Sequence, residues 1–130
     1  MNYLLDVNAL VAVGFTHHEF HDRVAAWIKA ARFPAMATCS ITELGFVRVL
    51  AQAPSYGITV TQARTLLSRL KKADALAFTF ILDDHDVSQL PTWVKSPKQT
   101  TDGHLLELAR ANGAVLATLD ERIPGAFLIP

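Results

Sequence analysis

The sequence contains a single cysteine, Cys39, among its 130 residues. One cysteine cannot form an internal disulfide, and it cannot supply the several thiolates of a cysteine-based zinc site. Disulfide-stapled scaffolds and cysteine-based zinc modules are therefore excluded. Cys39 lies where an apolar stretch becomes polar, and we expect it to fill a small space in the core.

The chain also lacks an excess of charge of either sign. Lys and Arg together number 12, and Asp and Glu together number 12, so the formal net charge is zero. Without a global field to attract it, a nucleic acid would have to bind a local basic patch. The composition thus argues against a protein that coats phosphate backbones through general positive charge.

No apolar run approaches the roughly 18 residues of a membrane span, because Asp, His, Arg or Thr interrupts each stretch. The first six residues have neither the basic start nor the long apolar core of a signal peptide. We therefore expect a soluble, cytoplasmic protein with no membrane partner. Hydrophobic residues make up 51%, too many for disorder, and the length suits one domain, residues 1–130.

Short apolar runs alternate with segments of helical periodicity along the chain. The runs are continuous rather than alternating, which is typical of a parallel sheet with both faces covered by helices. We therefore predict an α/β fold with a mainly parallel sheet. The expected strands are 3–5, 36–39, 77–82, 114–117 and 126–129, and the expected helices are 9–14, 17–32, 40–51, 62–72 and 101–112.

Polar residues predict where three of these helices begin. Thr16 with Glu19, and Ser40 with Glu43, match the capping-box pattern, in which the two side chains each bond to the other residue's backbone. Thr61 is expected to cap the helix 62–72.

Four acidic residues fall where predicted strands end or predicted helices begin. In a parallel α/β sheet, ligands bind beyond the carboxyl ends of the strands, beside helix N-termini. Four of the 12 acids are therefore expected at one edge of the sheet. Asp6 follows the first strand, Asp120 follows the fourth, Asp102 opens the helix 101–112, and Glu43 lies in the first turn of the helix 40–51.

Carboxylates held close together repel and raise each other's pKa, which destabilises a fold that does not compensate them. A hard divalent cation removes this conflict, and Mg²⁺ needs only one or two carboxylates beside its waters and a substrate phosphate. Water activated by such an ion can attack a phosphodiester in line. The four acids therefore predict a metal site for phosphodiester hydrolysis.

Each acid also has a purely structural explanation. The capping box accounts for Glu43, a favourable interaction with the helix dipole accounts for Asp102, and a turn before the stretch 121–125 accounts for Asp120. Asp6 is harder to explain in this way, because it directly follows a buried apolar run. The joint placement of the four, rather than any one of them, favours the metal site.

With these residues placed, the sequence resembles the PIN-domain family, and within it the VapC-like toxin ribonucleases of prokaryotic toxin–antitoxin systems. Four stretches carry the resemblance, in the family's order and over nearly the whole chain. They are 4–10 (LLDVNAL), 38–50 (TCSITELGFVRVL), 101–109 (TDGHLLELA) and 116–120 (LATLD).

The resemblance implies a PIN-like α/β/α sandwich and an endoribonuclease that depends on Mg²⁺ or Mn²⁺. It implies Asp6, Glu43, Asp102 and Asp120 as the catalytic acids, with the metal held by the three aspartates. Asn8 would orient Asp6, and Thr118 would add a hydroxyl at the edge of the site. It also implies an RNA substrate, a cognate antitoxin and a homodimer.

Other residues are candidates for contacts to RNA. Arg48, Lys95 and Lys98 are placed to reach a phosphate backbone near the acids, and Trp93 to stack on an unpaired base, although it suits a core position equally. His17, His18 and His21 form a cluster in which 17 and 21 have the spacing of zinc ligands, but no third ligand follows. A solvated helix face is the preferred interpretation of that cluster.

Two other functions fit the same residues. A protein-binding module that kept the fold without catalysis predicts no stabilisation by metal. A metal-dependent DNA nuclease or phosphatase would share the site and differ only in its substrate.

Overall fold

Five parallel strands form the centre of the molecule, which the computed structural model describes over all 130 residues. They make one sheet in the order β3-β2-β1-β4-β5, and every neighbouring pair is parallel. Their carboxyl ends therefore lie along one edge. The strands are β1 (Asn2–Leu5), β2 (Ala35–Cys39), β3 (Ala77–Ile81), β4 (Ala114–Thr118) and β5 (Phe127–Leu128).

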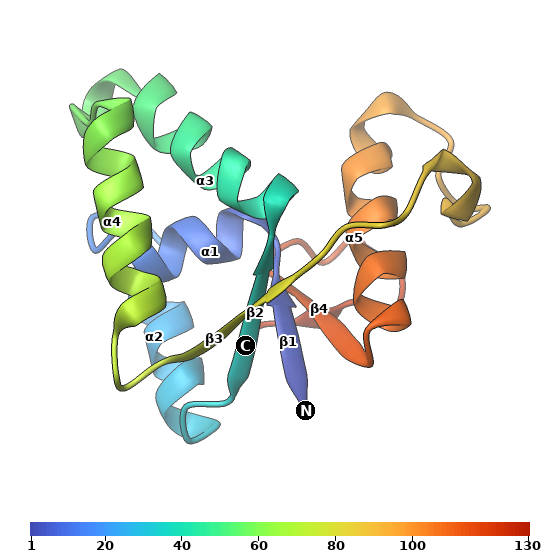
Figure 1. Cartoon of the computed structure of the whole chain (residues 1–130), viewed down its shortest axis with the longest axis horizontal. Coiled ribbons are helices and arrows are strands. Elements are labelled where there is room, and N and C mark those ends of the chain that lie inside the picture. The colour runs from blue at the N-terminus through green and yellow to red at the C-terminus, as the bar shows by residue number, and fades with distance from the viewer.

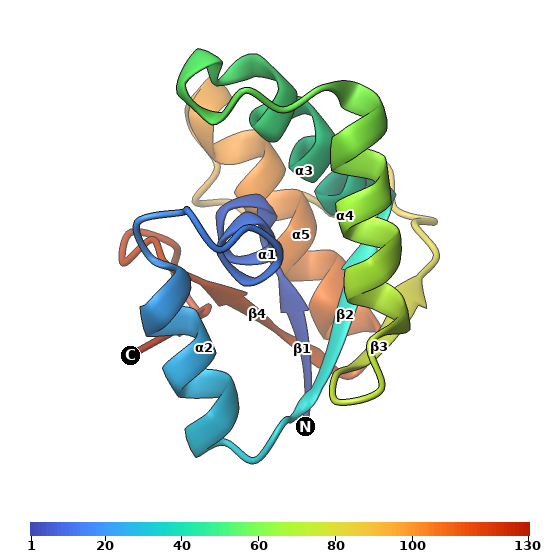
Figure 2. The ribbon, with the colours of Figure 1, turned by 90° about the vertical axis from the view of Figure 1, so that its left-hand side faces the viewer.

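Helices cover both faces of this sheet and make the predicted three-layer sandwich (Figures 1 and 2). On one face lie α1 (Val7–Gly14), α2 (His21–Ala30), α3 (Ser40–Gln52) and α4 (Val60–Lys72), and on the other lies α5 (Thr100–Ala111). Short 3₁₀ turns, η1 (Pro54–Tyr56), η2 (Val87–Gln89) and η3 (Pro97–Gln99), occur in the connections. None of the helices is long and apolar enough to cross a membrane.

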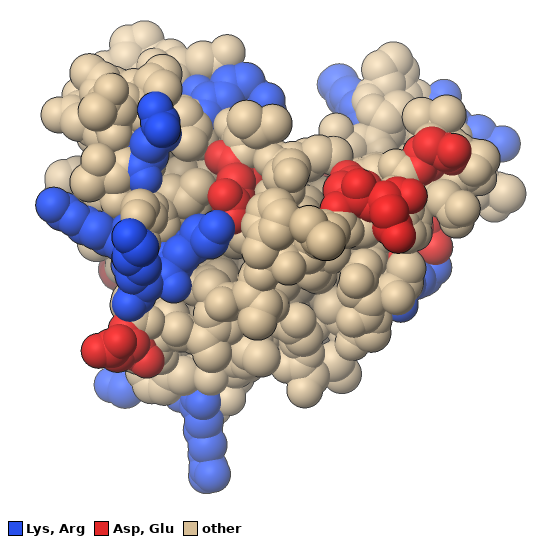
Figure 3. All heavy atoms as spheres, in the orientation of Figure 1, with Lys and Arg blue, Asp and Glu red and all other residues tan.

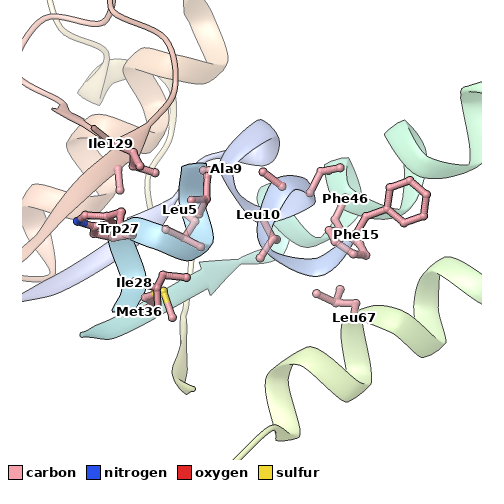
Figure 4. Close-up of a cluster of buried hydrophobic side chains, with 14 of the residues drawn as sticks. Leu5, Ala9, Leu10, Phe15, Trp27, Ile28, Met36, Phe46, Leu67 and Ile129 are labelled. Atoms are coloured by element: carbon pink, nitrogen blue, oxygen red, sulfur yellow. The ribbon is translucent and has the colours of Figure 1, made fainter. Parts of the chain in front are cut away.

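Successive strand residues point into two different cores, because side chains alternate between the faces of a sheet. Leu5 packs with α1 to α4, whereas Leu4 packs with α5. Figure 4 shows the larger core, in which Leu10 of α1 and Phe46 of α3 approach Leu67 of α4. Burial of both faces explains why the strands are continuous apolar runs.

Two helices begin at residues other than those that the capping patterns predicted. Thr16 and Glu19 do not cap α2, which begins at His21 with no side-chain cap, because residues 16–20 form turns in which His18 Nδ1 accepts the Phe20 N–H. Thr61 does not cap α4 either. Thr59 and Gln62 make the reciprocal capping bonds there, and the helix begins at Val60.

The helices that begin at the site edge, α1 and α3, are packed unusually closely. A Cβ atom added at Gly45 of α3 would lie 2.4 Å from Val7 Cγ2 of α1. Val7 directly follows Asp6, and Gly45 lies two residues after Glu43. The missing side chain at Gly45 thus fixes the separation of the two helix starts that carry these acids.

We predict that Gly45→Ala destabilises the fold by about 1–3 kcal/mol, because the added methyl overlaps Val7. Urea unfolding measures this. The double variant Gly45→Ala with Val7→Ala should recover part of the loss, since the smaller residue at 7 makes room. A single Gly45→Ala as stable as the wild type, or a double variant with simply additive losses, would contradict this packing.

Candidate active site at the carboxyl edge of the sheet

Asp6 is a buried carboxylate at the end of β1. Asp6 is only 8% exposed. Its side chain caps α1, because Oδ1 accepts the Ala9 N–H at 2.9 Å. Oδ2 accepts the Thr118 hydroxyl at 2.5 Å. No basic side chain pairs with it, so Asp6 keeps two hydrogen bonds but no compensating charge.

Thr118 connects Asp6 to the next acid. It is the last residue of β4, the strand beside β1, and its side chain is buried. While its hydroxyl donates to Asp6, its Oγ1 accepts the Asp120 N–H at 2.9 Å. This one hydroxyl therefore holds the Asp6 carboxylate and the Asp120 backbone side by side.

Asp102 lies in the first turn of α5, and its neighbour is a glycine for a steric reason. A Cβ atom at Gly103 would lie 2.4 Å from Val94 Cγ2 and 3.2 Å from Pro91 Cδ. The segment before α5 thus folds directly onto the start of the helix. This packing leaves Asp102 half-buried at the same edge as Asp6.

The charges of the three aspartates act on one another. Burial raises the pKa of Asp6 to about 6. The hydrogen bonds from Thr118 and Ala9 lower this pKa, and the charges of Asp102 and Asp120 raise it further. Burial, and then the charge of Asp120, also raise the pKa of Asp102. Asp6, Asp102 and Asp120 therefore form one electrostatic cluster.

Asp120 differs from the other two because it has a basic partner. Arg122 Nε and Nη2 donate to its two carboxylate oxygens at 2.9 and 3.1 Å. Hydrogen bonds from the Arg122 side chain and backbone lower the pKa of Asp120. The Arg122 side chain is 85% exposed, so solvent screens this pair and the arginine can leave without loss of core packing.

Glu43 lies in the first turn of α3 but does not cap it. The capping bond there runs from the Cys39 N–H to Thr42 Oγ1, at 3.0 Å, so the Ser40–Glu43 box is wrong. The Glu43 carboxylate instead accepts the Thr38 hydroxyl and Lys71 Nζ, each at 2.6 Å. The structural explanation offered for an acid at this position therefore fails.

The donor set fits a hard divalent cation. As the side chains stand, no three of the His, Cys, Asp and Glu groups are arranged to hold a metal. Two of the acids face basic side chains, Asp120 facing Arg122 and Glu43 facing Lys71. Mg²⁺ requires only one or two direct carboxylates. Asp6 and Asp102, which form no ion pair, and the easily released Asp120 can meet that need.

The chain matches the family model "PIN domain" over residues 3–126. It is 41% identical to Ribonuclease VapC38 of Mycobacterium tuberculosis over 123 residues, covering 90% of this chain and 84% of that protein. The chain belongs to the PIN domain family. Ribonuclease VapC44 of the same species is 39% identical over 137 aligned positions, covering 97% of this chain and 94% of that protein.

Solved structures share the architecture of this PIN domain. VapBC2 from Rickettsia felis, bound to a DNA fragment from its promoter, superposes with a TM-score of 0.64 over 98% of this chain and 97% of that one, at 17% identity. Mycobacterium tuberculosis VapC20, a toxin that cleaves the sarcin-ricin loop, superposes with a TM-score of 0.62 over 93% and 92%, at 11% identity. At these identities the likeness supports the fold.

The residues predicted to contact RNA differ in how far they are exposed to solvent. Arg48 on α3, and Lys95 and Lys98 around η3, are exposed. Trp93 is half-buried and packs against the core on the α5 side, which accounts for its presence in this loop. The three basic residues therefore remain the better candidates for phosphate contacts.

Asn8 and the histidine cluster take other positions than expected. Asn8 is exposed and makes no hydrogen bond to Asp6, which Ala9 and Thr118 orient instead. It lines a cavity of about 470 Å³ beside Asp120. His21 Nδ1 lies 2.6 Å from the Ala12 carbonyl oxygen, and His18 Nδ1 accepts a backbone N–H, so both serve local structure.

Three partners at the edge were missed from the sequence. Lys71 lies 28 residues from Glu43, and no periodicity indicates that pairing. His104 Nε2 lies 2.5 Å from Asp83 Oδ2, which joins α5 to the segment after β3. Only Arg122 had a local signal, because a basic residue two positions after a turn aspartate can reach back to it.

We predict that Asp6→Asn stabilises the metal-free protein at pH 7.5 by roughly 2 kcal/mol. The folded pKa of about 6 lies above the ordinary 3.8, so stability falls as the pH rises from about 4 to 6 and stays reduced above that. This difference between the folded and the ordinary pKa corresponds to about 3 kcal/mol of stability. The variant loses the carboxylate that accepts the Thr118 hydroxyl, which costs about 1 kcal/mol. Asparagine still caps the helix.

Unfolding by urea at pH 4 and pH 7.5 measures the difference. Most of the advantage of the Asp6→Asn variant should disappear at pH 4, where the folded wild type holds the proton and the unfolded chain, with its ordinary pKa of 3.8, is about half protonated. A variant that is less stable than the wild type at pH 7.5 would show that burial does not raise this pKa.

Proposed function

We propose that this PIN domain is a metal-dependent endoribonuclease, the toxin of a VapC-type toxin–antitoxin pair. The observation that carries the proposal is the buried Asp6 carboxylate, which lacks a cationic partner and lies in one electrostatic cluster with Asp102 and Asp120. The ribonucleases at 41% and 39% identity, aligned over nearly their whole length, support the same conclusion.

Asp6, Asp102 and Asp120 would hold Mg²⁺ or Mn²⁺, directly or through water. When bound, such an ion activates water and stabilises charge on the scissile phosphate. The residues of the chain supply the rest. Thr118 would fix the Asp6 carboxylate, and the close packing at Gly103 would fix the start of α5. Glu43 would complete the negative pocket and position the attacking water or a second ion.

The substrate backbone would cross this edge between two exposed basic groups. Arg48 lies on α3, on one side of the acids, and Lys95 and Lys98 lie around η3 before α5. Phosphate contacts from these residues position an RNA strand without reading its sequence. With a formal net charge of zero, the protein depends on such local contacts for affinity.

A cognate antitoxin and a second copy of the chain are the proposed protein partners. The Rickettsia felis structure contains VapBC2 as a complex on promoter DNA, which supports an antitoxin partner. The face of α3 and α4 beside β3 exposes Leu44, Val60 and Phe80, which suits contact with another protein surface. Light scattering of the isolated chain tests the homodimer.

We predict that Asp6→Asn and Asp120→Asn each reduce Mg²⁺- or Mn²⁺-dependent RNA cleavage by about 100-fold or more. The loss of metal-based charge stabilisation is worth several kcal/mol, and each 1.4 kcal/mol is about tenfold in rate. Cleavage of a structured RNA measures this. Asp74→Asn, an exposed aspartate between α4 and β3, is the matched control and should cleave like the wild type.

Thermal melts and substrate competition separate the rivals. Mn²⁺ should raise the melting temperature of the wild type but not of Asp6→Asn, because a ligand that binds only the folded state stabilises it. No cleavage above the protein-free background, with no shift of the melting temperature on adding metal, would favour the non-catalytic module. Preferred cleavage of single-stranded DNA or of a phosphomonoester over RNA would favour the other enzymes.

A further inference from the structure

One acid of the proposed site already has a cation beside it. Lys71, in the last turn of α4, reaches across to the first turn of α3 and places Nζ 2.6 Å from Glu43 Oε2. The Lys71 and Glu43 side chains are 31% and 22% exposed, so the pair is partly shielded from solvent. Figure 3 shows Lys and Arg side chains gathered over α4, on the same side of the molecule.

The pair fixes the Glu43 carboxylate as well as compensating its charge. Oε2 accepts both the Lys71 ammonium and the Thr38 hydroxyl, each at 2.6 Å, whereas Oε1 has no hydrogen-bond partner. Thr38 is buried in β2, so it provides a rigid support. Glu43 thus presents one oxygen held by the protein and one oxygen free for water.

The other acids show that Glu43 stands apart from them electrostatically. Asp102 and Asp120 raise the pKa of Asp6, and Asp120 raises the pKa of Asp102, but the charge of Glu43 contributes to neither. Asp6 and Asp102 form no ion pair. The uncompensated negative charge is therefore concentrated on Asp6 and Asp102, beside Asp120, where one divalent ion would balance it.

Resting on the proposed function, we propose that Lys71 takes the place of a second metal ion, so that the site binds a single divalent cation at the three aspartates. An ammonium in contact with Glu43 repels a further cation approaching that carboxylate. Lys71 also keeps Glu43 oriented by its bond to Oε2, which leaves Oε1 without a protein partner. Lys71 is thus a positioning residue that acts through Glu43.

The surroundings of Lys71 keep its ammonium at this place. Nζ lies 5.3 Å from the centroid of the Phe80 ring on β3, within the range of a cation–π interaction. Together with Glu43 and Phe80, Lys71 lines a groove of about 890 Å³ between α3 and α4. Lys72 borders the same groove but is exposed and forms no ion pair.

Counting bound Mn²⁺ ions tests the proposal without measuring cleavage. Electron paramagnetic resonance of free Mn²⁺ gives the number of ions bound per chain in a titration. The wild type should bind one ion. Lys71→Met keeps the length of the side chain but removes its charge, so the variant should bind two. Lys71→Gln, a polar replacement, should also bind two, and Lys71→Arg should bind one.

Lys72→Met is the matched control, because it removes the same charge from the adjacent position of α4, and it should bind one ion. One ion in both the wild type and the Lys71→Met and Lys71→Gln variants would overturn the proposal, as would two ions in the wild type. No binding by the wild type would contradict the metal dependence of the proposed function itself. The titration therefore distinguishes a failure of this inference from a failure of that function.

Discussion

A carboxylate buried without a cation is the constraint on which the site depends. Asp6 is required by α1 as its N-cap and by Thr118 as its acceptor, so the fold holds it in place at the end of β1. Burial raises its pKa to about 6, which means that the fold bears the cost of its charge at neutral pH. Such an arrangement is stabilised when a ligand of opposite charge binds beside the carboxylate. In the proposed function, a bound metal ion would balance this charge and restore stability at this edge.

The other acids of the proposed site are compensated to different degrees. Arg122 pairs with Asp120 in solvent and can be displaced, whereas Lys71 pairs with Glu43 in a partly buried groove beside Phe80. Asp102 has no partner and lies where α5 begins. A pair exposed to water is worth little, whereas removing one partner of a shielded pair leaves a charge without compensation and is costly. The site therefore combines two carboxylates that form no ion pair with two that do. Asp120 has an exposed partner, and Glu43 has a shielded one.

Patterns in the sequence predicted the parts of this structure that follow from local chemistry. The apolar runs located all five strands, and Asp6 and Asp120 were placed at strand ends because Asp6 directly follows one run and Asp120 comes shortly after another. Helix starts were less predictable. Thr16 and Glu19 matched a capping box, but His18 accepts the Phe20 N–H and His21 contacts the Ala12 carbonyl oxygen, and these contacts hold that segment in turns. The Lys71–Glu43 pair could not be predicted, because it arises from the packing of α4 on α3, and the packing angle leaves no periodic trace.

The close contact of Gly45 with Val7 has a consequence for how this site can change in evolution. Two apolar positions set the separation of the helices that begin beside Asp6 and Glu43. A larger residue at position 45 can be accommodated only together with a smaller one at position 7. Substitutions at positions 7 and 45 should therefore occur together. In chains whose cores have diverged, a larger side chain on one helix would be matched by a smaller one on the other, and the spacing of the acids would be preserved.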